Sequence, residues 1–191
     1  DLFGAPDAAV FLMATGTAAN SVALATLCPP YRGVFCAPLA HINCDEGGAP
    51  EFYMGGGKLL TVGDGSVMAP DTLDAAIRSA AGHGVHEVRG GAVSVTTVSE
   101  TGEVVGPDRI AALARVAHDH GLPVHLDGAR LANACAALGC TPAAITRDAG
   151  VDVAVFGATK NGCPGLEAVI FFDPAQADGF AERRKRGGHL F

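Results

Sequence analysis

Seven short hydrophobic runs, separated by segments with helical patterning, constrain the fold of this 191-residue chain more than any other feature. Most of the runs are continuously apolar and do not alternate with polar residues, which is typical of strands covered on both faces of a parallel sheet. The predicted strands are 8–14, 33–37, 58–62, 92–98, 123–127, 151–157 and 167–173.

Two of the intervening segments carry clear helix start and stop signals. Segment 69–84 opens with Pro-Asp and closes with glycine, and segment 106–123 has Pro107 and Asp108 at its start and Gly121 near its end. Strands that alternate with helices through right-handed crossovers predict an α/β fold with a doubly wound sheet. Ligands of such sheets bind beyond the carboxyl ends of the strands.

The composition and charge of the chain limit the class of protein to which it can belong. With 49% hydrophobic and 17% charged residues, the chain is expected to be one soluble globular domain. The net charge of −7 argues against a nucleic-acid partner, and the basic cluster at 182–189 is interpreted as the cationic end of a helix. No signal peptide is visible, and the apolar stretch 8–27 changes period midway, so it is predicted to form strand, turn and helix and not a membrane span.

The six cysteines contain no Cys-x-x-Cys pair, and no histidine lies at zinc-finger spacing, so no structural metal site is expected. Scattered cysteines fit a reducing compartment, which predicts a cytoplasmic protein.

The segment 13–20, with sequence MATGTAAN, is a candidate phosphate cradle. A strand is predicted to end at Gly16 and Thr17, where the N-terminus of a helix offers free N–H groups and a positive dipole end. The alternative is an ordinary turn in which Thr17 caps the helix. Neither the P-loop nor the G-x-G-x-x-G motif is present, so nucleotide binding by those motifs is not supported.

Asp127 is the last residue of a predicted strand, and Lys160 follows another predicted strand. Burial would suppress the charge of the Lys160 amine and make it a nucleophile that forms a Schiff base with a carbonyl group; the alternative is a loop lysine that reaches solvent. Asp127 would keep the ring nitrogen of pyridoxal phosphate protonated, or it would cap the following helix. Arg130 would orient Asp127 or bind a substrate carboxylate. The alternative is a simple ion pair with Asp127, three residues before it.

Two loops add weaker candidates. His41 lies in the glycine- and acid-rich loop 38–52, where an imidazole would stack on a flat cofactor, move a proton, or only face solvent. Segment 99–104 is expected to supply polar contacts or a turn, and His86 is a weaker candidate still. Together, a phosphate cradle, a ring-facing histidine, an aspartate and a lysine in order along one α/β sheet predict a coenzyme site.

Six stretches resemble a known family, in family order over essentially the whole chain. They are FLMATGTAAN, AHINCDEGGAPEFY, VHLDGARLANA, FGATKNG, EAVIFFD and RRKRGGHLF. The chain resembles the low-specificity L-threonine aldolases, including the phenylserine aldolases, which are fold-type I pyridoxal phosphate enzymes of the beta-eliminating lyase superfamily. The resemblance implies a three-layer sandwich around a mostly parallel seven-stranded sheet.

The resemblance also implies a role for each candidate residue. The implied roles are covalent cofactor attachment for Lys160, contact to the pyridine nitrogen for Asp127, ring stacking for His41, phosphate binding for Gly16 and Thr17, contact to the ring oxygen or the substrate carboxylate for Arg130, and a position near the substrate for His86. The implied reaction cleaves a β-hydroxy-α-amino acid to glycine and an aldehyde, with His41, His86 or a water as the base.

The resemblance further implies that residues 1–191 form one cofactor-binding large domain, without the N-terminal segment and C-terminal small domain of family members. Family members form sites between subunits of a homodimer or homotetramer. Thr159 and Asn161 flank the lysine where many relatives have serine and glycine, as in the phenylserine-like branch. The alternatives are another fold-type I reaction, such as β-elimination or transamination, and a catalytically incomplete fragment.

Overall fold

The computed structural model describes residues 2–81 and 84–190 and contains a seven-stranded sheet in the order β1-β7-β6-β5-β4-β2-β3. The strands are β1 (Ala9–Met13), β2 (Gly33–Cys36), β3 (Lys58–Thr61), β4 (Gly90–Thr96), β5 (Val124–Gly128), β6 (Val153–Gly157) and β7 (Glu167–Phe171). β7 pairs antiparallel with both β1 and β6, while the other pairs are parallel. The predicted α/β fold and all seven predicted strands are therefore confirmed.

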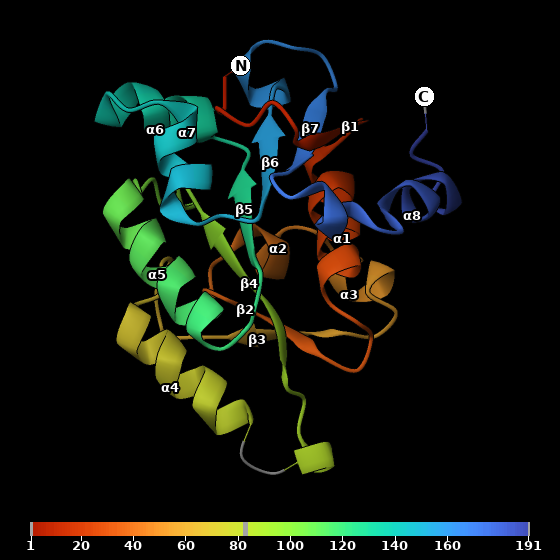
Figure 1. The fold of residues 1–191 in the computed structure, drawn as a ribbon, viewed down its shortest axis with the longest axis vertical. Helices are drawn as coiled ribbons and strands as arrows, with labels where there is room; N and C mark the ends of the chain where they lie inside the picture. Colours follow the sequence, from red (N-terminus) through yellow and green to blue (C-terminus); the bar gives the residue numbers. More distant parts are fainter. Residues whose placement is uncertain (1, 82–83, 191) are drawn as a thin grey trace.

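Helices cover both faces of the sheet, which gives three layers (Figure 1). α1, α3 and α8 lie on one face, and α4, α5, α6 and α7 lie on the other. The α-helices are α1 (Gly16–Leu27), α2 (His41–Cys44), α3 (Ala49–Tyr53), α4 (Pro70–Ala80), α5 (Pro107–Asp119), α6 (Leu131–Leu138), α7 (Pro142–Ile145) and α8 (Phe180–Arg186). The short 3₁₀ helices are η1 (Gly84–His86), η2 (Arg147–Ala149), η3 (Thr159–Asn161) and η4 (Pro174–Ala177).

The two helices with clear end signals are confirmed as α4 and α5, although residues 82–83 at the end of the first predicted segment lie outside the described residues. Pro107 occupies the first turn of α5, where its missing N–H would have had no partner. Gly121 follows the helix at φ +68°, and its N–H and that of Leu122 bond back to the carbonyls of His118 and Ala117. A glycine stop is required there because this left-handed conformation strains other residues.

The continuous apolar runs follow from burial on both faces. Val153, Val155 and Phe171 pack toward α1, whereas Val93 and Val124 belong to the core beneath α4 and α5. β1 differs because it is an edge strand: Met13 is buried, but Val10 and Leu12 are 56% and 46% exposed.

Strand pairing brings the site segments to one edge of the sheet. Asp127 in β5 lies opposite Thr96 of β4 and Val155 of β6. Glu167 of β7 pairs with Gly157 on one side and Met13 on the other, so β6 and β1 end at the same level. The N-terminus of α1, the end of β5 and the η3 turn therefore lie along the same carboxyl edge.

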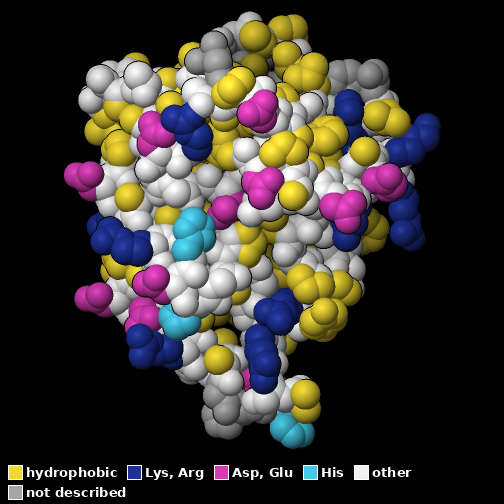
Figure 2. Space-filling model, viewed as in Figure 1, with side chains coloured by type: hydrophobic (Ala, Val, Ile, Leu, Met, Phe, Trp, Pro, Cys, Tyr) yellow, Lys and Arg dark blue, Asp and Glu magenta, His cyan; other side chains and the backbone are white. Residues whose placement is uncertain are grey.

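The basic cluster lies in α8. Its last turn carries Arg183, Arg184, Lys185 and Arg186, and Figure 2 shows basic side chains at the side of the molecule where α8 lies in Figure 1. The interpretation as a cationic helix end is confirmed. Within residues 2–81 and 84–190, no helix combines the length and apolar character that a membrane crossing requires.

Candidate active site

Asp127 is the buried carboxylate at the centre of the site. It is 8% exposed, and its Oδ1 accepts a hydrogen bond from the N–H of Ala129 at 3.0 Å. Its Oδ2 accepts one from Nδ2 of Asn20 on α1 at 3.2 Å. The residue preceding α6 is Arg130, so Asp127 does not cap that helix and the capping alternative is wrong. Asp127 also lines a small pocket.

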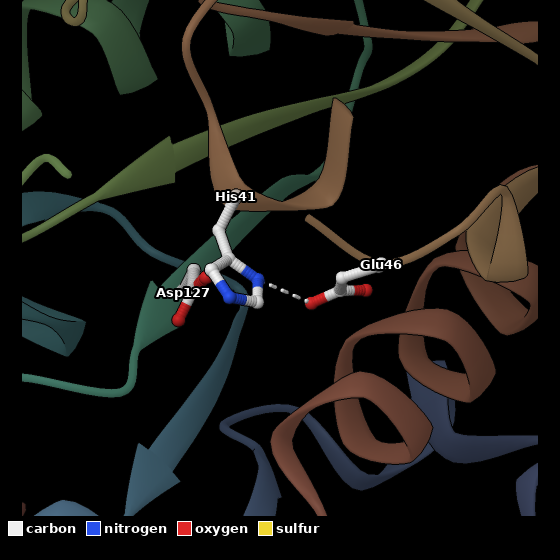
Figure 3. Close-up of side chains that lie close together, drawn as sticks. All are labelled: His41, Glu46 and Asp127. Atoms are coloured by element: carbon white, nitrogen blue, oxygen red, sulfur yellow. Dashed lines mark hydrogen bonds and ion pairs between the residues drawn. The ribbon is translucent and has the colours of Figure 1, made fainter. Parts of the chain in front are cut away.

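A hydrogen-bonded network joins Asp127, through Asn20, to Glu46 and His41; Figure 3 shows the bond between His41 and Glu46 beside Asp127. Nδ2 of Asn20 donates to both Asp127 Oδ2 and Glu46 Oε1, the latter at 2.8 Å. Nδ1 of His41 lies 3.0 Å from the same Glu46 oxygen. Nitrogen or oxygen atoms of His41, Glu46 and Asp127 all lie within 4.8 Å of one another, which is also the spacing of metal ligands. We assign the cluster to hydrogen bonding because the Asn20 amide already donates to both carboxylates.

Glu46 has the most perturbed carboxyl group of the site. Its side chain has no exposed surface, and burial raises its pKa to about 7. The hydrogen bonds from Asn20 and His41 oppose the rise, whereas the charge of Asp127 adds to it. Glu46 Oε2 is buried without a hydrogen-bond partner among the described residues. Sequence analysis missed Glu46 and Asn20; the signal for Glu46 was an acid five residues after His41 in a loop.

The pocket beside this network has mainly apolar walls and a few polar groups. Its apolar lining comes from Ala37, Ala40, Ile42, Val67, Met68, Val95, Val105 and Leu113. Its polar lining comes from His41, Ser66, Ser94, Thr96 and Asp127. The cavity measures about 20 Å³, so as it stands it has room for a water-sized molecule only.

His125 lies beneath Asp127 on the same face of β5, because residues two apart in a strand point the same way. It is fully buried, and its Nδ1 lies 3.0 Å from Oγ of Ser94. Burial lowers its pKa to about 4, against the opposing effect of the Asp127 charge. His125 is therefore neutral at pH 7, and its Nε2 is a second buried atom without a partner in the described part of the chain.

Arg130 forms a two-point ion pair with Glu100, at 2.8 and 3.0 Å. It does not form the predicted ion pair with Asp127, so that alternative is wrong. The Arg130 guanidinium holds the pKa of Glu100 below its usual range, with smaller contributions from His41 and Lys160. Glu100 therefore lies within electrostatic reach of Arg130, His41 and Lys160, three of the side chains predicted for the site. Segment 99–104 supplies a charged contact here.

Lys160 lies in the exposed η3 turn just after β6. Its neighbours shape the turn: Oγ1 of Thr159 accepts the N–H of Leu166 at 3.1 Å, and Nδ2 of Asn161 donates to the carbonyl of Gly157 at 2.7 Å. Of the two alternatives for Lys160, the structure has the loop lysine that reaches solvent. The buried amine is not observed.

The N-terminus of α1 differs in one detail from the prediction. Thr15, not Thr17, is the cap, and its hydroxyl accepts the N–H of Ala18 at 3.2 Å. Thr17 is half-buried, no acidic residue lies in the first turn of α1, and a Cβ on Gly16 would meet no atom within 4 Å. Open space at the positive end of a helix suits an anion.

The structure does not bring His86 to this edge. His86 is exposed in η1, which precedes β4, whereas Thr96 at the far end of β4 lines the pocket. At about 3.3 Å per residue, β4 alone separates the two by about 20 Å. Within this chain, the direction of β4 therefore puts His86 at the opposite edge of the sheet from Asp127.

Comparison with known proteins agrees with this geometry. The chain matches the Beta-eliminating lyase family over residues 1–191. It is 44% identical over 186 residues to the low specificity L-threonine aldolase of Pseudomonas sp. (strain NCIMB 10558), and 42% identical over 186 residues to that of Pseudomonas aeruginosa. Each alignment covers 96% of this chain and 53% of the relative. The structure of Leishmania major threonine aldolase superimposes with a TM-score of 0.90 at 28% identity, over 100% of this chain and 55% of that one.

These similarities define the class of the protein. An α/β sheet with a buried aspartate, a neighbouring histidine and a lysine at its carboxyl edge is the arrangement that the resemblance implied. The chain belongs to the beta-eliminating lyase family. It spans about half the length of the curated relatives that it matches.

Proposed function

We propose that this chain is the cofactor-binding large domain of a pyridoxal phosphate-dependent aldolase. The reaction cleaves β-hydroxy-α-amino acids of the threonine and phenylserine type to glycine and an aldehyde. The observation that carries the proposal is the buried Asp127 carboxylate at the same sheet edge as Lys160, in a chain 44% identical to a low specificity L-threonine aldolase.

The residues at this edge fit pyridoxal phosphate. Its protonated ring nitrogen needs a fixed carboxylate, and Asp127 is held by hydrogen bonds from Asn20 and Ala129. Its phosphate needs N–H donors without a competing acid, which the start of α1 at Gly16 offers. Its carbonyl group needs an accessible primary amine, which is the exposed Lys160.

Each side chain then has a defined task. Pyridoxal phosphate, when bound, supplies the electron sink for cleavage of the Cα–Cβ bond. Lys160 would attach the cofactor covalently, Asp127 would keep its ring nitrogen protonated, and His41 would lie against its ring. The ring nitrogen of His41 that does not contact Glu46 is the candidate acceptor for the β-hydroxyl proton, and His86, in η1 before β4, is the less favoured candidate.

Arg130 is the candidate for the ring oxygen or the substrate carboxylate. It is already paired with Glu100, so a bound carboxylate would have to compete with that side chain or share the guanidinium with it.

The proposal extends to the assembly. Residues 1–191 would act as a single large domain, with the remaining contacts to substrate and phosphate supplied by segments that the relatives carry in addition. The active form would be a cytoplasmic homodimer or homotetramer. All six cysteines are free thiols, which agrees with a reducing compartment.

The test is the near-visible absorption of the chain after addition of pyridoxal phosphate and removal of the excess. We expect a retained band in the wild type and in Lys185→Ala, a matched control on α8, but none in Lys160→Ala. A band that persists in Lys160→Ala would contradict the lysine assignment.

The reaction itself is tested by product analysis, on a protein that carries the additional segments of the relatives. Glycine and an aldehyde from threonine or phenylserine would support an aldolase. Ammonia and a keto acid would instead indicate β-elimination, the reaction for which the family is named.

A further inference from the structure

Glu46 is a buried carboxylate for which the proposed roles do not account. Its Oε1 receives two hydrogen-bonding groups at once, Nδ2 of Asn20 at 2.8 Å and Nδ1 of His41 at 3.0 Å. Carboxylates are almost never fully buried unless they are paired or used. Here both partners of Glu46 belong to the candidate active site.

We propose that Glu46 is a positioning residue that fixes the ring of His41 and its tautomer. Above its raised pKa of about 7, Glu46 is ionised and can only accept, so at pH 8 Nδ1 of His41 must donate to it. The other ring nitrogen, Nε2, is then left with a free lone pair. The inference rests on the proposed function only in giving His41 a place beside the cofactor.

The same carboxylate also orients the amide of Asn20. Because Nδ2 donates to both Glu46 and Asp127, a flipped amide would turn its oxygen toward two carboxylates. One residue in the loop after β2 therefore steers both groups that would touch the cofactor ring, His41 directly and Asp127 through Asn20. Figure 3 shows the ring of His41 near the carboxyl groups of both Glu46 and Asp127.

The charged groups around Glu46 support its role as a positioning residue. The titratable groups that act on Glu46 are His41 and Asp127, and the nearby negative charge of Asp127 adds to the effect of burial in raising the pKa of Glu46 to about 7. A carboxylate held only to cap a loop would gain nothing from a position next to a second buried carboxylate. Its position is explained by the hydrogen bond to His41, which needs an acceptor at this place.

The experiment observes the His41 ring directly, in the chain without cofactor and labelled with ¹⁵N-histidine. Long-range ¹H–¹⁵N spectra report which ring nitrogen is protonated. The variants are Glu46→Met, which keeps the volume but has no acceptor; Glu46→Gln, which keeps an acceptor oxygen; and Asp45→Asn, an exposed neighbouring carboxylate as control.

We expect a proton on Nδ1 of His41 in wild type, Asp45→Asn and Glu46→Gln, and a shift of the proton to Nε2 in Glu46→Met. Retention of the wild-type tautomer in a folded Glu46→Met protein would overturn the inference. If that variant does not fold, the wild-type spectrum decides, because a wild-type proton on Nε2 is incompatible with donation to Glu46.

Cofactor affinity gives an independent readout. The pyridoxal phosphate dissociation constant, measured by absorption, is expected to rise about tenfold in Glu46→Met and to stay near the wild-type value in Glu46→Gln and Asp45→Asn. A tautomer change, together with no cofactor binding even in a protein that carries the additional segments of the relatives, would leave this inference intact and refute the proposed function. Attachment of the cofactor through Lys160, with an unchanged His41 tautomer in Glu46→Met, would support the proposed function and overturn this inference.

Discussion

The two halves of the candidate site differ in how deeply their charged side chains are buried. On one side, Asp127 and Glu46 are buried, and each is held by hydrogen bonds from Asn20 or His41. On the other side, Lys160 lies in an exposed turn, and Arg130 and Glu100 form a half-exposed ion pair. The first half is rigidly positioned by the core, whereas the second is solvated.

The difference follows from what each half would do. A carboxylate that keeps a ring nitrogen protonated works best in a fixed position with little competing water, where electrostatic interactions are strong. A lysine that reacts with an incoming carbonyl group must be accessible. Substitutions in the buried half should therefore change stability and its pH dependence, while those in the exposed half should change activity alone.

The largest expected effect is on turnover and comes from the exposed half. In a protein that carries the additional segments of the relatives, Lys160→Ala should lower the proposed aldol cleavage by on the order of 10³-fold or more, because the proposed covalent attachment point is lost. Its free energy of unfolding should change by no more than about 0.5 kcal/mol, since the side chain is exposed. Steady-state assays and urea denaturation measure the two quantities. A large loss of stability would place Lys160 in the buried half after all.

Glu46→Gln should have the largest effect on stability. The pKa of Glu46 is raised from 4.5 to about 7, so the folded protein holds a proton that the unfolded chain has lost between these values. The wild type should thus lose stability as pH rises from 4.5 to 7. The variant should lack this loss and gain up to about 3 kcal/mol above pH 7.

Chemical denaturation of Glu46→Gln and wild type at pH 5 and pH 8 measures this gain. Asp45→Asn, which removes an exposed charge next to Glu46, serves as control and should show no such pH dependence. Equal differences at the two pH values would show that Glu46 is not strained by burial.

His125→Asn tests a pH dependence of stability with the opposite sign, also in the buried half of the site. The pKa of His125 is lowered from 6.5 to about 4, so below pH 6.5 the unfolded chain takes up a proton that the folded protein refuses. The wild type should lose up to about 3 kcal/mol as pH falls from 6.5 to 4. His125→Asn should lose less over that range, whatever fixed cost it carries from the bond to Ser94. Thermal melts at pH 4.5 and 7 measure the difference.

The smallest expected effect belongs to the Arg130–Glu100 pair. Glu100→Gln should change the free energy of unfolding by about 0–1 kcal/mol, because half-exposed ion pairs are screened by solvent. The same variant frees the Arg130 guanidinium, so substrate KM should respond more than stability. A stability loss above 2 kcal/mol would contradict the division into a buried and a solvated half.

Several features were predictable because they depend on local pattern. Continuous apolar runs and Pro-Asp and glycine signals predicted the seven strands and the helices α4 and α5. The placement of Asp127 at the end of one strand and of Lys160 just after another predicted that they share the carboxyl edge of the sheet, and strand pairing confirms it. These are properties of short segments and of a general rule for parallel sheets.

Other features depended on contacts between distant segments. Asn20 and Asp127 are 107 positions apart and meet only because α1 packs over β5. Arg130 pairs with Glu100 from the end of β4 and not with the nearer Asp127, and the direction of β4 puts His86 at the opposite edge of the sheet. The sequence alone determined the layered α/β fold and the types of residue at its edge. Only the tertiary structure decided which of them meet, because burial and pairing of a charge depend on neighbours that the chain brings together only after it has folded.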